Sequence, residues 1–301
     1  MTTFSATDAA LEGFRLTRER LRTVLVWGGF QFALSVVMAL LMIKLGGQSL
    51  MALEEAGSDA DPAMIMQQFR ELGPLYAVLL PLGLLVLSVS LAAVYRAVLT
   101  PEDSRNFYLR FGPDEARLAA LTVVYFFLWS FIVFVVVLSA GMVAALAAAV
   151  LGPAGGLAGL AVGLFATGLV AYIVVRLSLS HAITFGEKRI SVFGSWRMTR
   201  GVFWKLLGAY LLATAAMVVV GLLALVIFTS IGGAVVLSMG GQIADVGKMF
   251  APDPASLSSY FTVATVIYLA FGGLLQAVYY AVIFAPAAVA YKALRNRTDL
   301  H

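Results

Sequence analysis

The sequence predicts an all-α polytopic membrane protein, a helical bundle with six transmembrane helices, and three observations lead to it. Of the 301 residues, 61% are apolar and only 12% are charged, against about 45–50% and about 25% in an average soluble domain. The mean hydropathy is +0.96. The run from Leu118 to Val175 contains no charged residue at all. This composition excludes a soluble enzyme, a disordered chain and a nucleic-acid-binding domain.

Each predicted span is a run of about 20 or more apolar residues, the length that crosses a bilayer. A Gly-Pro-Ala-Gly-Gly turn at residues 152–156 divides the longest run in two. The first run is too long for a signal peptide and no Ala-x-Ala site follows it, so we expect an uncleaved helix. The six spans are Thr23–Leu45, Pro74–Leu99, Ala116–Leu151, Gly156–Leu179, Phe203–Val236 and Tyr260–Leu294.

Basic residues concentrate on one side of the predicted membrane. All but three of the 20 Lys and Arg residues lie in the N-terminus, the C-terminus, or the connections after the second and fourth spans. The exceptions, Lys44, Arg70 and Lys248, share their connections with acidic residues. The positive-inside rule therefore predicts that both termini are cytoplasmic. We expect a multi-pass protein of the bacterial inner (cytoplasmic) membrane.

The chain is expected to form one integral membrane domain, residues 1–301, with units at about 1–100, 101–180 and 181–301. The pattern aromatic-Arg-aliphatic-Thr-Arg occurs at Phe14–Arg18, before the first span, and again at Trp196–Arg200, before the fifth. When the two copies are aligned, the apolar positions continue with spacings of 3, 4 and 3, which predicts one stripe along a helix. The paired residues are Phe14, Thr17, Leu21 and Val24 with Trp196, Thr199, Phe203 and Leu206.

A threefold repeat extends this interpretation. The segment Phe107–Phe111 would be a degenerate middle copy, so that each unit has an amphipathic helix on the cytoplasmic surface followed by a two-span hairpin. The even-numbered spans also end alike, in Val94-Tyr95-Arg96, Val174-Val175-Arg176 and Ala290-Tyr291-Lys292. The alternative is chance similarity between basic amphipathic stretches, which the positive-inside rule enriches in any case.

Two stretches around the fourth connection carry a family resemblance. Residues 185–188 read Phe-Gly-Glu-Lys, and residues 195–208 read SWRMTRGVFWKLLG. They resemble the membrane-domain family named after glycerophosphoryl diester phosphodiesterases, which has a similar acidic-Gly-Lys region and a Ser-Trp-x-x-Thr-x-Gly-x-Phe-Trp pattern. The resemblance implies a six-span architecture with an uncharacterised role, because the phosphodiesterase itself is a separate soluble barrel. His181-Ala182-Ile183 departs from the family, in which a proline is usual after the fourth span.

Basic and aromatic residues near the cytoplasmic surface are the candidate binding site. Each Lys or Arg near an anionic leaflet contributes about 1 kcal/mol, and tryptophan favours the membrane interface. We expect these residues to bind anionic lipid headgroups or a protein partner, which includes a second copy of the chain; the plainer alternative is topology and anchoring alone. The candidates are Arg15, Arg18, Arg22, Trp196, Arg197, Arg200, Trp204 and Lys205.

The span interiors carry no Asp, Glu, Lys or Arg. Their polar residues would either line a cavity or join packed helices by hydrogen bonds. The cavity candidates are Gln31, Ser88, Gln276 and Tyr280. Such a cavity would suit a transporter or flippase for lipids or small neutral solutes, and this is the alternative function.

The leading prediction is a non-catalytic membrane-organising or partner-binding protein. No catalytic, cofactor-binding or metal-binding constellation is expected, because the chain has no cysteine and two histidines. His181 lies close to Ser178 and Ser180 but lacks a nucleophile elbow. The four-residue spacing of Gly155, Gly159 and Gly163 predicts a close helix approach, within the chain or with a second protomer.

Overall fold

The protein is described by a computed structural model that covers residues 5–56, 61–152, 155–238, 240, 242 and 256–298. Within these residues six helices are long and apolar enough to cross a membrane. This confirms the all-α polytopic fold and the six predicted spans. The helices are α2 (Leu21–Ala56), α4 (Gly73–Leu99), α5 (Pro113–Leu151), α6 (Gly155–Leu177), α9 (Phe203–Ser238) and α12 (Val263–Thr298).

The bounds agree closely with the prediction except at the first and last spans: α2 continues to Ala56, beyond the predicted end at Leu45. A separate short helix, α11 (Leu257–Tyr260), ends at Phe261, so α12 begins at Val263 rather than at Tyr260. The predicted turn residues 153–154 and Lys248 lie outside the described residues. With 36 residues, α2, α9 and α12 are each about 54 Å long. They therefore extend beyond a hydrocarbon layer of about 30 Å or cross it at a tilt.

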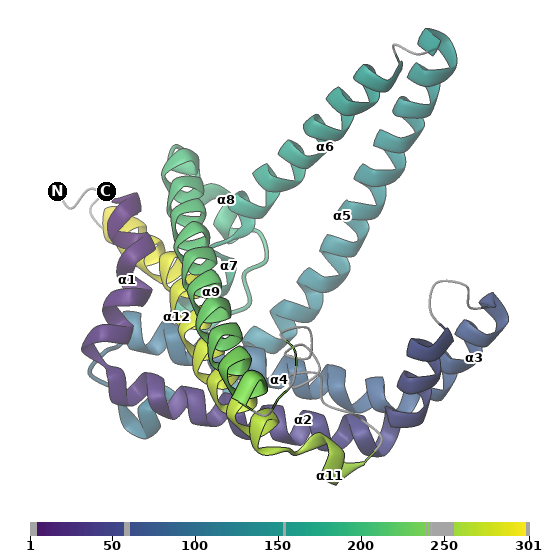
Figure 1. Cartoon of the computed structure of the whole chain (residues 1–301). Coiled ribbons are helices and arrows are strands. Elements are labelled where there is room, and N and C mark those ends of the chain that lie inside the picture. The colour runs from purple at the N-terminus through teal and green to yellow at the C-terminus, as the bar shows by residue number, and fades with distance from the viewer. Residues whose placement is uncertain are drawn as a thin grey trace.

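Shorter helices connect the spans (Figure 1). The N-terminal helix begins after Ser5, whose side chain accepts a hydrogen bond from the Asp8 N–H and so caps it. The 3₁₀ turn η2 precedes α5, and two short helices stand between α6 and α9. These elements are α1 (Ala6–Glu19), α3 (Pro62–Glu71), η2 (Arg105–Tyr108), α7 (Ser180–Glu187) and α8 (Gly194–Met198).

The alignment of the two pattern copies reappears in the helix bounds. It pairs Leu21 with Phe203, where α2 and α9 begin, and it also pairs the last residues of these two helices, so that both contain 36 residues. The predicted continuous stripes, however, are wrong. Helix α1 ends before Arg20, and α8 is separated from α9 by a turn in which Gly201 has a φ of +81°. Leu21 consequently turns outward and is 58% exposed, whereas Val24 and its counterpart Leu206 are fully buried.

The predicted middle amphipathic helix is also wrong. Asn106, Phe107 and Tyr108 all have positive φ, a conformation that right-handed helices exclude. The backbone instead turns back so that the Tyr108 ring enters the interior, where it is 1% exposed.

The segment that opens each unit packs on the hairpin of another unit. Helix α1 lies on α9 and α12, η2 lies on α2 and α4, and α7 and α8 lie on α5 and α6. The first unit therefore contacts the third, the second contacts the first, and the third contacts the second. This closes a ring of contacts among three hairpins.

The hairpin ends meet in one apolar cluster, which we call the common core. It collects the ends of α4, α6 and α12, together with residues of α1, α7 and α9. The similar endings of the even-numbered spans thus lie together, with Tyr95, Val175 and Tyr291 all buried. Its largest fully buried side chains include Tyr95, Tyr108, Leu118, Leu179, Leu206 and Tyr291.

Glycines allow the closest helix crossings. A Cβ on Gly273 would lie 2.7 Å from the Phe32 nitrogen and 2.8 Å from the Gly28 oxygen, so only glycine fits where α12 crosses α2. A Cβ on Gly13 would overlap the Val282 Cα, where α1 crosses α12. The ring of contacts therefore depends on backbone-to-backbone packing.

The predicted glycine stripe of α6 has a smaller role. A Cβ on Gly155 would overlap the Ala148 backbone of α5, which confirms a close approach within the chain. A Cβ on Gly159 would lie 3.7 Å from the Ala144 Cβ, an ordinary contact. Gly163 has nothing within 4 Å among the described residues. The α5–α6 hairpin diverges from the other helices (Figure 1) and presents most of its surface outward.

Candidate lipid-binding surface

A short segment that runs from α8 into the first turn of α9, residues Trp196–Lys205, carries most of the predicted lipid-binding residues, and we call it the basic segment. Two buried hydroxyls fasten it to the end of α6. Ser195 Oγ donates to the Arg176 carbonyl at 2.8 Å and accepts from the Leu179 N–H at 3.1 Å. Thr199 Oγ1 donates to the Ser195 carbonyl at 2.8 Å and also lies 3.3 Å from the Arg176 carbonyl at the end of α6. The segment is therefore held in one conformation although most of its side chains are exposed.

Trp196 is partly exposed, but its ring also packs against a buried residue. The Arg176 guanidinium lies over its ring at 4.7 Å and over Tyr172 at 5.9 Å. Arg176 is 7% exposed, and in the described part of the chain it makes no ion pair. Contact with an aromatic face partly offsets the cost of burying a cation. Sequence reasoning placed Trp196 at the lipid interface and missed this contact with Arg176.

The remaining cations of the basic segment are free to bind a ligand. Arg197, Arg200 and Lys205 are exposed, and no carboxylate of the described residues lies within 4.0 Å of them. Trp204 is 78% exposed and packs only its edge against Phe203. Unpaired cations beside an exposed indole are the chemistry that an anionic membrane surface attracts.

The three N-terminal arginines that were predicted to bind lipid divide into two kinds. Arg18 and Arg22 are exposed, and they form no ion pair among the described residues. Arg15, in contrast, is paired with Glu12 at 2.7 Å on the next turn of α1. Arg18 and Arg22 therefore resemble the basic segment, and Arg15 does not.

Cations of the α4–α5 connection are neutralised within the chain. Arg110 and Arg105 bind Asp103 at 2.6 and 3.1 Å and hold the pKa of that carboxyl well below its usual range. Asp114 accepts from Arg117 at 2.6 Å and from Lys188 at 2.7 Å.

Because these cations are paired with carboxylates of the same chain, they have little net charge left to attract an anionic partner. Sequence reasoning chose among the cations by their position near aromatic residues; only the structure separates paired from unpaired ones.

Arg96, the cation that ends the second span, lies in the interior. It is 5% exposed, pairs with the buried Glu115, and lies 3.6 Å from Asp114. It also donates to the Tyr108 carbonyl at 3.1 Å, and its guanidinium lies over the Phe185 ring at 5.5 Å. This buried pair joins α4 to the start of α5 and has a structural role.

The predicted cavity residues are used in packing. Gln31 is 5% exposed, and its Nε2 donates to Ser90 Oγ at 2.9 Å, which joins α2 to α4. Ser88 is fully buried and donates to the Leu84 carbonyl of its own helix.

Gln276 and Tyr280 are partly buried, and the Tyr280 ring stacks on Phe284 at 5.3 Å. The pockets found among the described residues between α1 and α12, between α5 and α6, and beside Arg96 are lined by other side chains.

His181 lies in a groove of about 680 Å³ between α5 and α6. Its ring contacts Tyr125 with centroids 5.3 Å apart, and its Nε2 is 3.2 Å from Thr122 Oγ1. The neighbouring serines point elsewhere: Ser178 donates to the Val175 carbonyl and Ser180 to the Val192 carbonyl. The structure thus does not pair His181 with either serine.

Comparison with known proteins gave no relative: no protein-family model, no curated protein and no solved structure matches this chain. The resemblance of residues 195–208 to the glycerophosphoryl diester phosphodiesterase membrane-domain family stays a prediction.

Proposed function

We propose that this six-span protein is a non-catalytic membrane-organising protein whose basic segment binds anionic lipid headgroups of the cytoplasmic leaflet. The observation that carries the proposal is the contrast between paired and unpaired cations. Cations of the α4–α5 connection are paired with carboxylates, whereas Arg197, Arg200 and Lys205 are exposed and unpaired in the described structure.

The orientation in this proposal comes from the sequence. Most Lys and Arg residues lie in the segments that connect one hairpin to the next or in the termini, and such segments are retained in the cytoplasm. The basic segment would then face the anionic leaflet of a bacterial inner membrane. Arg18 and Arg22 would add to the same charged surface.

The expected free energies of binding support a preference for anionic lipid. Three cations at about 1 kcal/mol each give about 3 kcal/mol, which is about a hundredfold in affinity. The exposed Trp204 would hold the segment at headgroup depth. The hydroxyl anchors at Ser195 and Thr199 reduce the ordering entropy that binding must overcome.

Native mass spectrometry of the delipidated full chain with equal amounts of phosphatidylglycerol and phosphatidylcholine tests the proposal. Arg197→Gln with Arg200→Gln should lower the preference for phosphatidylglycerol about thirtyfold, at about 1 kcal/mol for each cation. The matched control is Arg105→Gln with Arg189→Gln, which also removes two exposed arginines but takes them from Asp103 and Glu187.

The control should change the preference by about twofold or less, since exposed paired charges contribute little. Equal losses in the two double variants would show that net charge alone attracts the lipid. That result, or no loss in either variant, would overturn the proposal.

A further inference from the structure

The groove that holds His181 lies between α5 and α6 at the base of the hairpin, far from the turn that joins the two helices (Figure 1). Its volume of about 680 Å³ is in the range of small-ligand sites, roughly 300–1,000 Å³. Its lining residues recur every three to four positions, so they form one face of each helix. They run from Thr122 to Val133 on α5, and from Val174 to His181 on α6 and into α7.

The groove is most polar at one end and apolar at the other. At the end where α6 leads into α7, His181 Nε2 is 3.2 Å from Thr122 Oγ1. Val133 and Val174 lie at the opposite end. The positions of Thr122 and Val133 on one helix make the groove about 16 Å long. Its polar end lies next to the connections that the basic residues mark as cytoplasmic, so its polarity matches that of a lipid in the cytoplasmic leaflet.

The groove lies on lipid-facing helices, and its described lining contains no Asp, Glu, Lys or Arg. A phosphate in the groove would therefore lack a cation, and an ammonium would lack a carboxylate. Burying a charge without a partner is strongly unfavourable. The groove consequently favours a lipid whose headgroup is uncharged.

The hydroxyl protons of the lining are already used within the protein. Each of its four hydroxyls donates to a backbone carbonyl: Thr122 to Leu118, Tyr125 to Val192, Ser130 to Phe126 and Ser178 to Val175. A hydroxyl has only one proton, so the contact between His181 and Thr122 requires the imidazole to donate from Nε2.

The second ring nitrogen of His181 is then available to a ligand. In a neutral imidazole that carries its proton on Nε2, the Nδ1 atom is an acceptor. It has no hydrogen-bond partner in the described part of the chain. The polar end of the groove can therefore accept a hydrogen bond from a hydroxyl.

We propose that this groove binds an uncharged glycerolipid with a free hydroxyl, of the diacylglycerol class. Its hydroxyl would donate to His181 Nδ1, and an acyl chain would lie along the apolar end between Val133 and Val174. A lipid without the hydroxyl would leave the partly buried acceptor unsatisfied. The proposal shares no residue with the basic segment and does not depend on lipid binding there.

Native mass spectrometry of the delipidated full chain tests the proposal with two ligands of equal chain length. They are dioctanoylglycerol and its 3-acetyl ester, in which the hydroxyl is capped. Dioctanoylglycerol should bind about fivefold tighter than the ester, the effect of one hydrogen bond. An equal concentration of dioctanoylphosphatidylglycerol should not displace it, because a phosphate finds no cation in the groove.

A substitution of His181 tests the polar end. His181→Phe keeps an aromatic ring against Tyr125 but removes both ring nitrogens, so the two ligands should bind equally. Ser130→Ala is the matched control. It removes a hydroxyl of the same groove that is already bonded to its own helix, and it should keep the fivefold difference.

Filling the groove tests the apolar end independently of His181. Val133→Trp places a large side chain in the groove and should weaken both ligands about tenfold or more. Val143→Trp is the control, because Val143 is similarly exposed on α5 but lines another pocket further along the hairpin. It should leave both ligands unchanged.

Several results would overturn the proposal. They are equal binding of the two ligands to the wild-type chain, an unchanged difference in His181→Phe, displacement by phosphatidylglycerol, and equal losses in the two tryptophan variants. A dimer that dissociates in Val133→Trp would also overturn it, because the groove would then be a protein interface. If His181→Phe fails to fold, the wild-type comparison and the tryptophan variants decide. Arg197→Gln with Arg200→Gln should keep the fivefold difference, so this proposal and the basic-segment proposal fail independently.

Discussion

The common core and the α5–α6 hairpin are made from similarly apolar helices but are stabilised in different ways. In the most apolar part of α4, 44% of the residues are buried inside the protein, against 11% in α5 and 6% in α6. The hairpin presents a series of large side chains outward, including Phe126, Phe127, Phe131 and Phe134.

The difference shows that apolar side chains alone do not hold helices together in a bilayer. Lipid solvates an exposed leucine or phenylalanine as well as a protein interior does, so apolar surface alone does not drive helices together. The common core is held instead by a buried ion pair, interhelical hydrogen bonds and glycine crossings. The hairpin needs its helix length, its tight turn and a few contacts such as Gly155 against Ala148.

The largest expected effect is on the buried ion pair. Glu115→Ala would remove the buried carboxylate that pairs with Arg96, leave only the more distant Asp114, and lower the free energy of unfolding by about 3–5 kcal/mol. Thermal unfolding in detergent measures this. Phe131→Ala on the hairpin, where the ring is 66% exposed, is the control and should stay within about 0.5 kcal/mol. Similar losses in both variants would contradict the distinction between the two regions.

A glycine crossing should give an intermediate effect. Gly273→Ala places a methyl group against the backbone of α2 and should destabilise the protein by about 1–3 kcal/mol through overpacking. Gly163→Ala in the hairpin meets no atom of the described chain within 4 Å and should be neutral or slightly stabilising. The same unfolding measurement compares them, and an unaffected Gly273→Ala variant would argue against the close α2–α12 crossing.

The smallest effect concerns a hydrogen bond at the base of the hairpin. Tyr125 is 5% exposed and its hydroxyl donates to the Val192 carbonyl at 2.7 Å. Tyr125→Phe should cost about 0.5–1.5 kcal/mol. Tyr279→Phe, at a 41% exposed ring, should cost less than that. A larger loss for Tyr279→Phe would mean that the base of the hairpin is not fixed by this bond.

The sequence predicted the spans well because a bilayer selects helices by length and composition, and both are local. The bounds of α2 and α9 follow the alignment of Phe14–Arg18 with Trp196–Arg200, although the predicted spans had not applied it. The alignment did not predict the breaks at Arg20 and Gly201, where the chain must turn from a connecting segment into a span. These two breaks depend on local backbone turns, which the apolar pattern of the sequence does not indicate.

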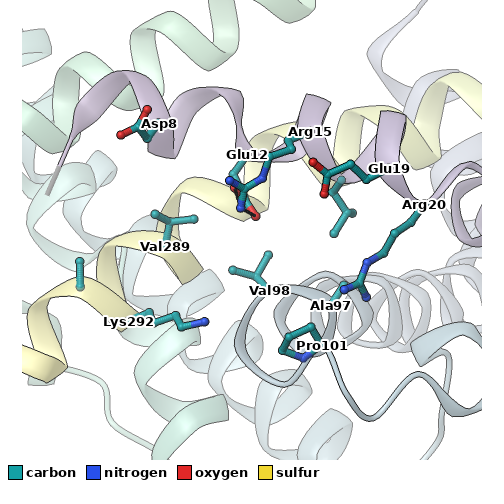
Figure 2. A pocket seen from close by; sticks show the side chains of 12 residues that line it. Asp8, Glu12, Arg15, Glu19, Arg20, Ala97, Val98, Pro101, Val289 and Lys292 are labelled. Atoms are coloured by element: carbon teal, nitrogen blue, oxygen red, sulfur yellow. Dashed lines mark hydrogen bonds and ion pairs between the residues drawn. The ribbon is translucent and has the colours of Figure 1, made fainter. Parts of the chain in front are cut away.

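The candidate site was predicted only in part for a related reason. Sequence reasoning selected residues such as Arg197 and Trp204, which are exposed in the structure, but it could not show that Arg110 is paired and Arg200 is not. Pairing with Asp103 depends on the tertiary course of the α4–α5 connection. The pocket between α1 and α12 (Figure 2) could not be predicted, because lining residues such as Glu19 and Lys292 come from opposite ends of the chain.

The ring of contacts among three hairpins is tested most directly by a disulfide cross-link. The chain has no cysteine, so introduced pairs report without background. A Cβ on Gly208 of α9 would lie 4.0 Å from the Ala6 Cβ of α1, within the usual disulfide range of about 3.5–4.5 Å.

Ala6→Cys with Gly208→Cys should form the disulfide in membranes as readily as the hairpin pair Ala144→Cys with Gly159→Cys, where the spacing is 3.7 Å. Ala6→Cys with Gly163→Cys should not, since Gly163 has no neighbour within 4 Å in the described structure. Cross-linking of the hairpin pair without cross-linking of the α1–α9 pair would contradict the ring.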